Sequence, residues 1–528
     1  MRRRIRARRR TAAVSAALLL AASCSPGDEA DPSAGGTVTV GLPGIGSLQP
    51  AEATSPAALA VLRAACDPLI AEEPATGELE PALADRWTVE EGGMGLSIRL
   101  KAGARFHGGA AVVPARVAEY LSGIGQTGGA SPAARRLAAL LRPGEDVSGT
   151  IRVTDDGALR IDLPQPFAGL PVLLADPALV PLASADEGSA ELPDCAGPYR
   201  IRAAEGGVDL VRDPGYTTGN GAFSGGGRGY AATIRVRAYE SAEAAYEALR
   251  AGEVDAAPVP ASRVAEVEAQ PSGHVRRGTA EITYLAFDLT GGVTADPAFR
   301  RAVSLAVDRV ALVDANFGDR RPPATRWLVE APDRPSPAAC ESGARRVAQP
   351  DRARQMLAEA GIDPAGVRLP LLFDQARTSP RVAQAVAVQL EENLSIDVRP
   401  QGLDVAEFEA AVAGGAGPRA WVATTPGDLS VPEQVLEALF RTGSPANTNR
   451  FTDARMDELL AEARQAAGPG ERTRAHAQAE DRACELMGGV PLWSGVSHWA
   501  FAPDRVSFSS PVPIDALGGL LLREARPR

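Results

Sequence analysis

The side chains that most often carry out chemistry in proteins are scarce here and form no catalytic motif. The sequence has no GxSxG nucleophile elbow, no HExxH zinc motif, no GxxxxGK[ST] phosphate loop and no dinucleotide fingerprint after a strand. His107 lies in Phe106-His107-Gly108-Gly109, which is typical of a surface turn. We therefore interpret the chain as a non-enzyme without a cofactor. An extracellular hydrolase is the alternative, and it would need a nucleophile and a base.

Cys24 is the one residue for which we expect a covalent modification. Residues 1–10 are strongly cationic, and residues 12–22 are almost wholly apolar. This pattern predicts a signal peptide over residues 1–23, because the apolar stretch is far shorter than a span of roughly 20 residues. The closing Ala21-Ala22-Ser23-Cys24 resembles the bacterial lipobox. It implies lipid on Cys24, while an ordinary secretory signal is the alternative.

Residues 24–36 follow as a polar, acidic stretch rich in Pro and Gly, which predicts a flexible lipidated tether. The protein would then lie outside the cytoplasm, anchored by lipid to the outer face of the cytoplasmic membrane. An even number of cysteines remains in that oxidising compartment: Cys66, Cys195, Cys340 and Cys484. They predict two disulfides with three possible connectivities. We expect no metal site, because no pair has CxxC spacing.

Composition indicates a globular protein of two or three domains, with 45% hydrophobic and 23% charged residues. The formal net charge is -11, and removal of the seven arginines of the signal leaves -18. A surface this acidic argues against nucleic acid as a partner.

Periodicity predicts a mixed α/β chain. Residues 37–42 alternate like a strand, and residues 151–153 and 159–163 flank Asp155-Asp156-Gly157 like a hairpin. Asp296-Pro297 is typical of an N-cap and first helical residue. A second helix is predicted from Asp351 to a stop at Gly361.

Eight sequence blocks follow one another in an order that resembles a known family. They include a "P-x-L-A-x-x-W" pattern at 81–87, an "F-x-x-G" pattern at 106–109 and Gly197-Pro198-Tyr199, and the others lie at 212–216, 249–255, 284–288, 299–309 and 353–361. The chain is similar to the extracytoplasmic solute-binding proteins of ABC importers. Among these proteins it resembles bacterial solute-binding protein family 5, the class that binds dipeptides, oligopeptides and nickel.

The resemblance implies an α/β, two-lobed, periplasmic-binding-protein-like fold with an extra subdomain and a hinge between the lobes. Lobe I is expected at 37–66, 185–283 and 496–528, the subdomain at 67–184 and lobe II at 284–495. The family layout also favours pairing Cys66 with Cys195 and Cys340 with Cys484.

The resemblance places the ligand in the cleft between the lobes. Peptide-binding relatives carry an aspartate for the peptide's amino terminus where this chain has Thr424. A threonine cannot offset a buried ammonium, so we expect no preference for a free amine unless Asp428 substitutes. Trp421 is the leading candidate for a pocket wall, with packing in the lobe core as the alternative. The other candidates near the cleft or hinge are Arg419, Tyr284, Asp288, Trp493 and Trp499.

These features predict a monomeric, lipid-anchored binding protein that delivers a small solute to an ABC permease. Peptides lead the expected ligands, with nickel complexes, sugars or an organic cation as alternatives. A sensor or surface protein with the same fold but no permease is the second class considered.

Overall fold

The structure is a computed structural model that describes most of the chain after residue 34. The described ranges are 35–73, 78–141, 149–184, 192–216, 230–269, 272–318, 320–328, 346–414, 417–425, 434–444, 446–466, 469–510, 513–515 and 518–528. Cys24, Cys340 and Asp428 lie outside them. Among the described residues, no helix has the length and apolar character needed to cross a membrane.

A ten-stranded mixed sheet runs through both lobes and joins them. Its strand order is β14-β13-β15-β12-β16-β11-β1-β10-β9-β8. The strands are β1 (Thr37–Pro43), β8 (Tyr199–Ala204), β9 (Gly207–Arg212), β10 (Thr233–Tyr239), β11 (Ala256–Pro258), β12 (His274–Phe287), β13 (Arg368–Asp374), β14 (Asp397–Leu403), β15 (Ala420–Thr424) and β16 (Val490–Phe501).

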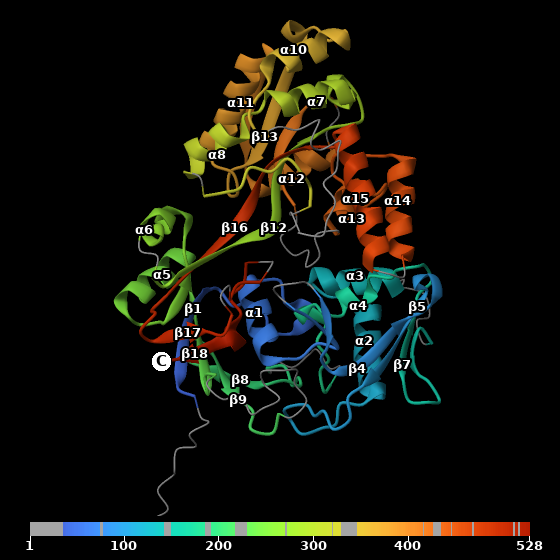
Figure 1. Ribbon diagram of the computed structural model, residues 1–528, viewed down its shortest axis with the longest axis vertical. Coiled ribbons are helices and arrows are strands. Elements are labelled where there is room, and N and C mark those ends of the chain that lie inside the picture. The colour runs from blue at the N-terminus through green and yellow to red at the C-terminus, as the bar shows by residue number, and fades with distance from the viewer. Residues whose placement is uncertain are drawn as a thin grey trace, which may run out of the picture.

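The long antiparallel strands β12 and β16 cross from one lobe to the other (Figure 1). At one end β16 pairs with β11 of lobe I, and at the other β12 pairs with β15 of lobe II. These two strands are therefore the covalent hinge. The predicted two-lobed α/β class is confirmed, whereas the exact domain boundaries stay a prediction.

Lobe I contains the strands β1 and β8 to β11 together with a smaller sheet. That second sheet has the order β4-β5-β7-β6 and lies beside the hairpin of β2 with β3. The four strands of the sheet are β4 (Ala84–Val89), β5 (Gly95–Leu100), β6 (Ile151–Val153) and β7 (Leu159–Asp162), and those of the hairpin are β2 (Ile70–Glu72) and β3 (Leu79–Pro81). The helices here are α1 (Pro56–Ala65), α2 (Pro114–Thr127), α3 (Pro132–Leu141), α4 (Leu170–Leu173), α5 (Ala242–Ala251) and α6 (Val264–Glu268). Close to the C-terminus, β17 (Val506–Phe508) pairs with β18 (Ala525–Pro527).

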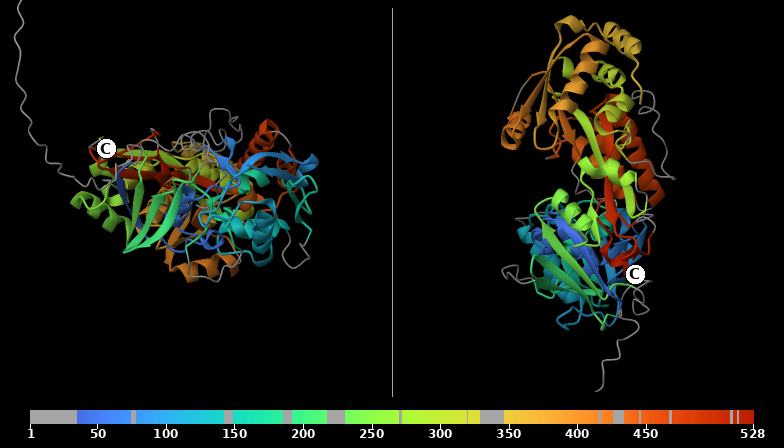
Figure 2. Two further views of the ribbon diagram at one scale, coloured as in Figure 1. Left: turned by 90° about the horizontal axis from the view of Figure 1, so that it is seen from below. Right: turned by 90° about the vertical axis from the view of Figure 1, so that its left-hand side faces the viewer.

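Lobe II surrounds β13, β14 and β15 with helices on both faces (Figures 1 and 2). These are α7 (Pro297–Ala306), α8 (Arg309–Phe317), α10 (Pro350–Glu359), α11 (Pro380–Leu394), α12 (Val405–Gly414), α13 (Gln434–Phe440), α14 (Ala454–Gln465) and α15 (Pro469–Leu486). Successive residues of a strand point to opposite faces, so the two faces have separate cores. Leu285 and Val422 belong to the core under α7 and α11, while Ala286 and Trp421 belong to the one under α13 to α15.

The local signals in the sequence produce the expected elements. β6 and β7 pair antiparallel with Val153 opposite Leu159. The Asp296 carboxylate caps α7 by accepting a hydrogen bond from the Ala298 N–H at 2.8 Å, with Pro297 at the first helical position. α10 ends before Gly361, whose φ of 68° is a conformation that glycine adopts without strain.

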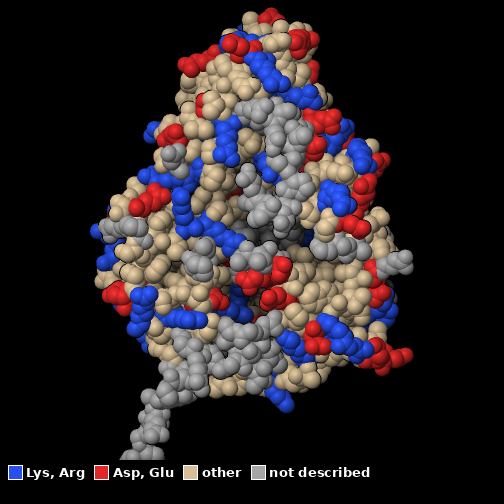
Figure 3. Space-filling view, viewed as in Figure 1, with Lys and Arg blue, Asp and Glu red and all other residues tan. Residues whose placement is uncertain are grey.

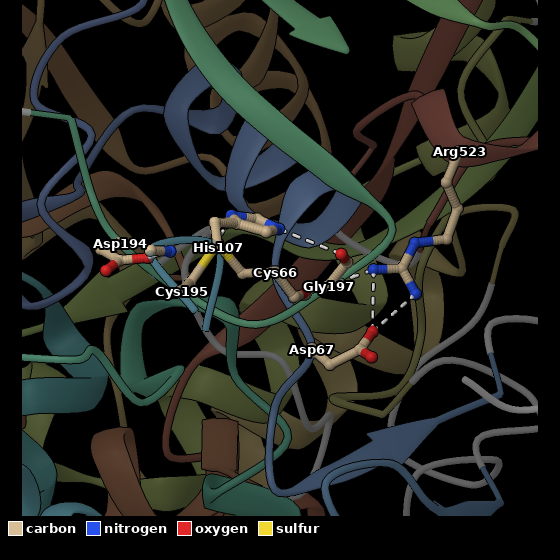
Figure 4. Close-up of a disulfide and its surroundings, with 8 residues drawn as sticks. Cys66, Asp67, His107, Asp194, Cys195, Gly197 and Arg523 are labelled. Atoms are coloured by element: carbon tan, nitrogen blue, oxygen red, sulfur yellow. Dashed lines mark hydrogen bonds and ion pairs between the residues drawn. A yellow bond between two sulfur atoms is a disulfide. The ribbon is translucent and has the colours of Figure 1, made fainter. Parts of the chain in front are cut away.

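A buried disulfide joins Cys66 to Cys195 across 129 residues of chain (Figure 4). Cys66 ends α1, and Cys195 lies just before β8, so the bridge ties together the two ends of the subdomain segment. Beside it, the His107 ring lies 3.0 Å from the Gly197 carbonyl oxygen, and burial lowers the pKa of this histidine. Cys484 is also disulfide-bonded, and the expected pairing with Cys340 stays a prediction.

Candidate ligand-binding cleft

A cavity of about 870 Å³ lies between the two lobes. Lobe I and the C-terminal segment line it with Thr54, Pro56, Leu59, Arg63, Asp515 and Gly519. The crossover strands contribute Glu281, Thr283 and Trp493. Lobe II contributes Phe317, Arg321, Arg377, Thr378, Ser379, Val382, Thr424 and Thr425. This volume lies in the range typical of small-molecule sites, roughly 300 to 1,000 Å³.

An irregularity in the hinge strands shapes the middle of the cavity. Gly278 pairs with Val496 and Ile282 with Ser494, so three residues of β12 oppose the single residue Gly495 of β16. A bulge of this kind bends a strand and re-aims its side chains. A Cβ atom at Gly495 would lie 3.1 Å from the Cβ atom of Glu281. The glycine therefore lets the bulge, and with it Glu281, pack closely against β16.

The walls of the cavity carry charges of both signs. Arg63 forms an ion pair with Asp515 inside lobe I. Arg377 contacts Asp374 at 3.5 Å. The Arg321 guanidinium carbon lies 4.8 Å from the centre of the Phe317 ring, which is a cation–π contact. The cleft therefore offers both carboxylates and guanidinium groups to a solute.

Burial disfavours the charged forms of two cleft residues, Glu281 and Arg321. The pKa of Glu281 is raised, chiefly by burial, although Arg321 and Arg377 oppose the shift. The pKa of Arg321 is lowered, again chiefly by burial, with Glu281 opposing. Both shifts mean that the charged form of each side chain lacks the solvation it has in water.

Of the residues singled out in the sequence, Thr424 lines the cavity, and Trp493 does so from β16. The Thr424 hydroxyl lies 3.4 Å from that of Thr283 on the neighbouring strand. The Trp493 side chain is 4% exposed, and its indole N–H has no hydrogen-bond partner among the described residues. Trp499 instead donates to the Gly518 carbonyl oxygen at 3.0 Å and packs in lobe I.

Trp421 and Tyr284 lie in the core of lobe II and not on the wall of the cleft. Trp421 is 1% exposed and packs in the cluster beneath α13 to α15. The physical reason is strand alternation, since Trp421 and Thr424 are an odd number of residues apart and point to opposite faces. Tyr284 is 3% exposed, contacts the Trp327 ring edge-on, and has its pKa raised by burial.

Asp288 and Arg419 form an ion cluster with Arg450 beyond the far end of β12. Arg419 and Arg450 each approach the buried Asp288 carboxylate at 3.3 Å. Strands rise about 3.3 Å per residue, so this cluster lies well away from Thr283 at the cavity. Asp288 and Arg419 therefore contact each other, and neither is among the described residues that line the cavity.

Sequence reasoning missed Glu281, Arg321 and Arg377 as cleft residues. The signal that could have found Glu281 is a charged residue directly before the mostly apolar stretch from Ile282 to Phe287. Arg321 and Arg377 lie in loops, where charge carries no such signal. Within the described ranges, no group of three His, Cys, Asp or Glu side chains is placed to hold a metal ion.

Comparison with known proteins gives the class of the molecule. The profile of the family described as bacterial extracellular solute-binding proteins, family 5 Middle, matches residues 78–447. The periplasmic murein peptide-binding protein MppA of Escherichia coli K12 is 29% identical over 192 residues, which cover 34% of each chain. The probable deoxycholate-binding periplasmic protein YgiS of the same organism is 24% identical over 442 residues, 76% of this chain and 78% of its own.

A solved structure has the same architecture. The unliganded open form of MppA superposes with a TM-score of 0.77 at 20% identity, covering 93% of this chain and 97% of that one. The fold and the family match agree, and the chain belongs to the bacterial extracellular solute-binding proteins of family 5. This confirms the assignment to the solute-binding proteins of ABC importers, which act outside the cytoplasm.

Proposed function

We propose that this protein captures a small solute, most favourably a peptide, in the cleft between its lobes and delivers it to an ABC permease. The single observation that carries the proposal is the cavity of about 870 Å³, whose lining comes from both lobes and from the hinge strands. A solute there can contact all of these walls at once only when the lobes are closed.

The physical mechanism is a shift of population between open and closed forms. A ligand favours the form in which it makes more contacts, and it shifts the equilibrium only by its difference in affinity for the two forms. The two crossover strands permit hinge closure, because they are the continuous strands that join the lobes. A permease that recognises the closed shape would then accept loaded protein selectively.

Peptides lead the ligand list because the relative MppA is named for murein peptides. YgiS is named for deoxycholate, so family membership does not dictate one ligand. Thr283, Thr424 and the charged residues of the cleft supply the polar groups that a peptide backbone and its termini require.

We further propose that the mature protein is a monomer held at the membrane by lipid on Cys24. Residues 24–36 would separate the lipid from β1, the first strand of lobe I. An extended chain of this length reaches up to about 45 Å, which would let the lobes turn freely above the membrane.

Native mass spectrometry of protein purified without denaturation tests the capture of a solute. We expect an added mass that is lost on unfolding, and small-angle scattering should show a more compact particle when the solute is returned. Thr424→Trp should weaken both signals by occupying part of the cavity, whereas Thr88→Trp on the exposed edge of β4 should leave them intact. Equal binding by both variants would contradict the cleft as the binding site.

A further inference from the structure

Among the described charges that line the cleft, one carboxylate and one guanidinium group take part in no ion pair and no hydrogen bond. The charged lining residues are Arg63, Glu281, Arg321, Arg377 and Asp515. Arg63 and Asp515 pair with each other, and Arg377 pairs with Asp374. Among the described residues, neither Glu281 nor Arg321 forms a hydrogen bond or an ion pair, although each opposes the other's pKa shift electrostatically.

A half-buried charge without a partner is unfavourable in the free protein. Burial removes water from the charged group, and only an opposite charge or a set of hydrogen bonds compensates for it. Charged residues that are left unpaired in a cleft are candidates for ligand recognition for this reason. The bulge in β12 also holds Glu281 at the cavity, which an ordinary solvated glutamate would not require.

The region around Arg321 is suited to an anion. Arg321 stacks on Phe317, a contact that holds the planar guanidinium in place. Arg377 lines the same cavity, as do Thr378 and Ser379 at the start of the 15-residue helix α11. The amino end of a helix carries partial positive charge, which adds to that of the two arginines.

We propose that the cleft selects a zwitterionic solute, with a cationic nitrogen at Glu281 and a carboxylate at Arg321. The proposal rests on the function proposed above and specifies the chemistry of its ligand. It also changes the expectation for Thr424, because the acid absent at that position is supplied from the adjacent strand. Glu281 lies two residues before Thr283, which pairs with Thr424, and all three residues line the cavity.

Calorimetry with three related probes tests the two charges separately. The probes are trialanine, N-acetyl-trialanine, which lacks the ammonium, and trialanine amide, which lacks the carboxylate. We expect trialanine to bind about tenfold or more tightly than either blocked form at pH 7, since each removed charge leaves a cleft charge unpaired.

Two variants assign each preference to its residue. Glu281→Gln should weaken the binding of trialanine and leave that of N-acetyl-trialanine nearly unchanged. The ratio of these two affinities, which measures the preference for a free amine, should then fall close to one. Arg321→Gln should weaken the binding of trialanine and leave that of trialanine amide nearly unchanged, so that the ratio of the two affinities falls close to one. The matched controls are Glu392→Gln and Arg352→Gln, which change exposed residues of α11 and α10. Because each readout is a ratio within one variant, a partial loss of folded protein does not imitate it.

The outcomes separate this proposal from the one on which it rests. If probes bind without regard to their charges, or if the ratios survive Glu281→Gln and Arg321→Gln, the charge assignment is wrong while capture of a solute stands. If no probe binds and no solute is carried by the purified protein, the proposed function fails and the charge assignment fails with it.

Discussion

At the scale of residues, the environment of a side chain and not its type separates core from cleft. Trp421 and Trp493 are both buried aromatic residues on central strands of the same sheet. Trp421 packs among apolar side chains under α13 to α15, whereas Trp493 borders the interlobe cavity. Their roles therefore differ although their sequence surroundings look alike.

Replacing Trp421 with alanine should chiefly lower stability. Removal of a fully buried tryptophan costs roughly 3 to 5 kcal/mol, because the core cannot collapse onto the space that is left. Urea unfolding of ligand-free protein measures this loss. Trp87→Ala, at a half-buried position of β4, is the matched control and should cost clearly less. Unchanged stability with weaker solute binding would instead place Trp421 at the ligand.

At the scale of elements, the two crossover strands carry a pair of histidines at their lobe I ends. The His274 Nε2 atom lies 3.1 Å from His498 Nδ1, and the two rings are stacked with centroids 5.3 Å apart. Burial and then the neighbouring His274 lower the pKa of His498 to about 4, with Glu268 opposing and Arg276 and Arg320 adding to the effect. The pair is therefore neutral in the folded protein at pH 7.

Acidification should weaken the fold through this pair. The unfolded chain binds the proton at a pKa of about 6.5 and the folded chain only near 4, so stability is full above the first value and is lost as the pH falls toward the second. We expect a loss on the order of 1 to 2 kcal/mol between pH 7 and pH 5, measured by urea unfolding. His498→Asn keeps a polar atom opposite His274 but cannot titrate, and it should reduce this dependence. An identical pH dependence in both proteins would rule out His498 as its source.

The disulfide between α1 and the segment before β8 joins the two ends of the chain segment that forms the subdomain. Because it closes 129 residues, it restricts the unfolded chain strongly. Replacing Cys66 and Cys195 together with alanine should lower the free energy of unfolding by about 2 to 5 kcal/mol. Non-reducing peptide mapping of the exported protein should find these two cysteines linked. An unchanged unfolding midpoint in the double variant would show that the bridge does not stabilise the fold.

At the scale of the whole molecule, surface charge and the proposed anchor determine where the protein works. Basic and acidic side chains are interspersed over the face in Figure 3, so no broad basic surface for nucleic acid appears there. The net negative charge of the chain also provides no attraction to an anionic membrane. Membrane attachment would therefore depend on the lipid.

Loss of the lipid site should release the protein. Cys24→Ala in the exported protein removes the sulfur that would carry the lipid, so fractionation should find the variant in the medium or soluble fraction. The reason is that acyl chains contribute about 0.8 kcal/mol per buried methylene, and the variant lacks them. Ser25→Ala is the matched control and should stay with the membrane. Retention of the Cys24 variant would contradict the anchor.

The sequence by itself determined the class of fold and many of its elements. The strand predicted at 37–42, the hairpin around Asp155-Asp156-Gly157, the cap at Asp296 and the stop at Gly361 all follow from residues close together in the chain. Caps, turns and alternation are local, so their signals are complete within a few residues. The order of eight such blocks was enough to indicate the family.

Only the tertiary structure decided which residues line the cleft. Glu281, Arg321 and Arg63 are far apart in sequence and meet because a bulged hinge strand, a loop of lobe II and a helix of lobe I face one cavity. Which face Trp421 occupies depended on the register of β15 between β12 and β13. A strand pattern shows that faces alternate, but the partners packed on each face decide which one is core and which one is open to a ligand.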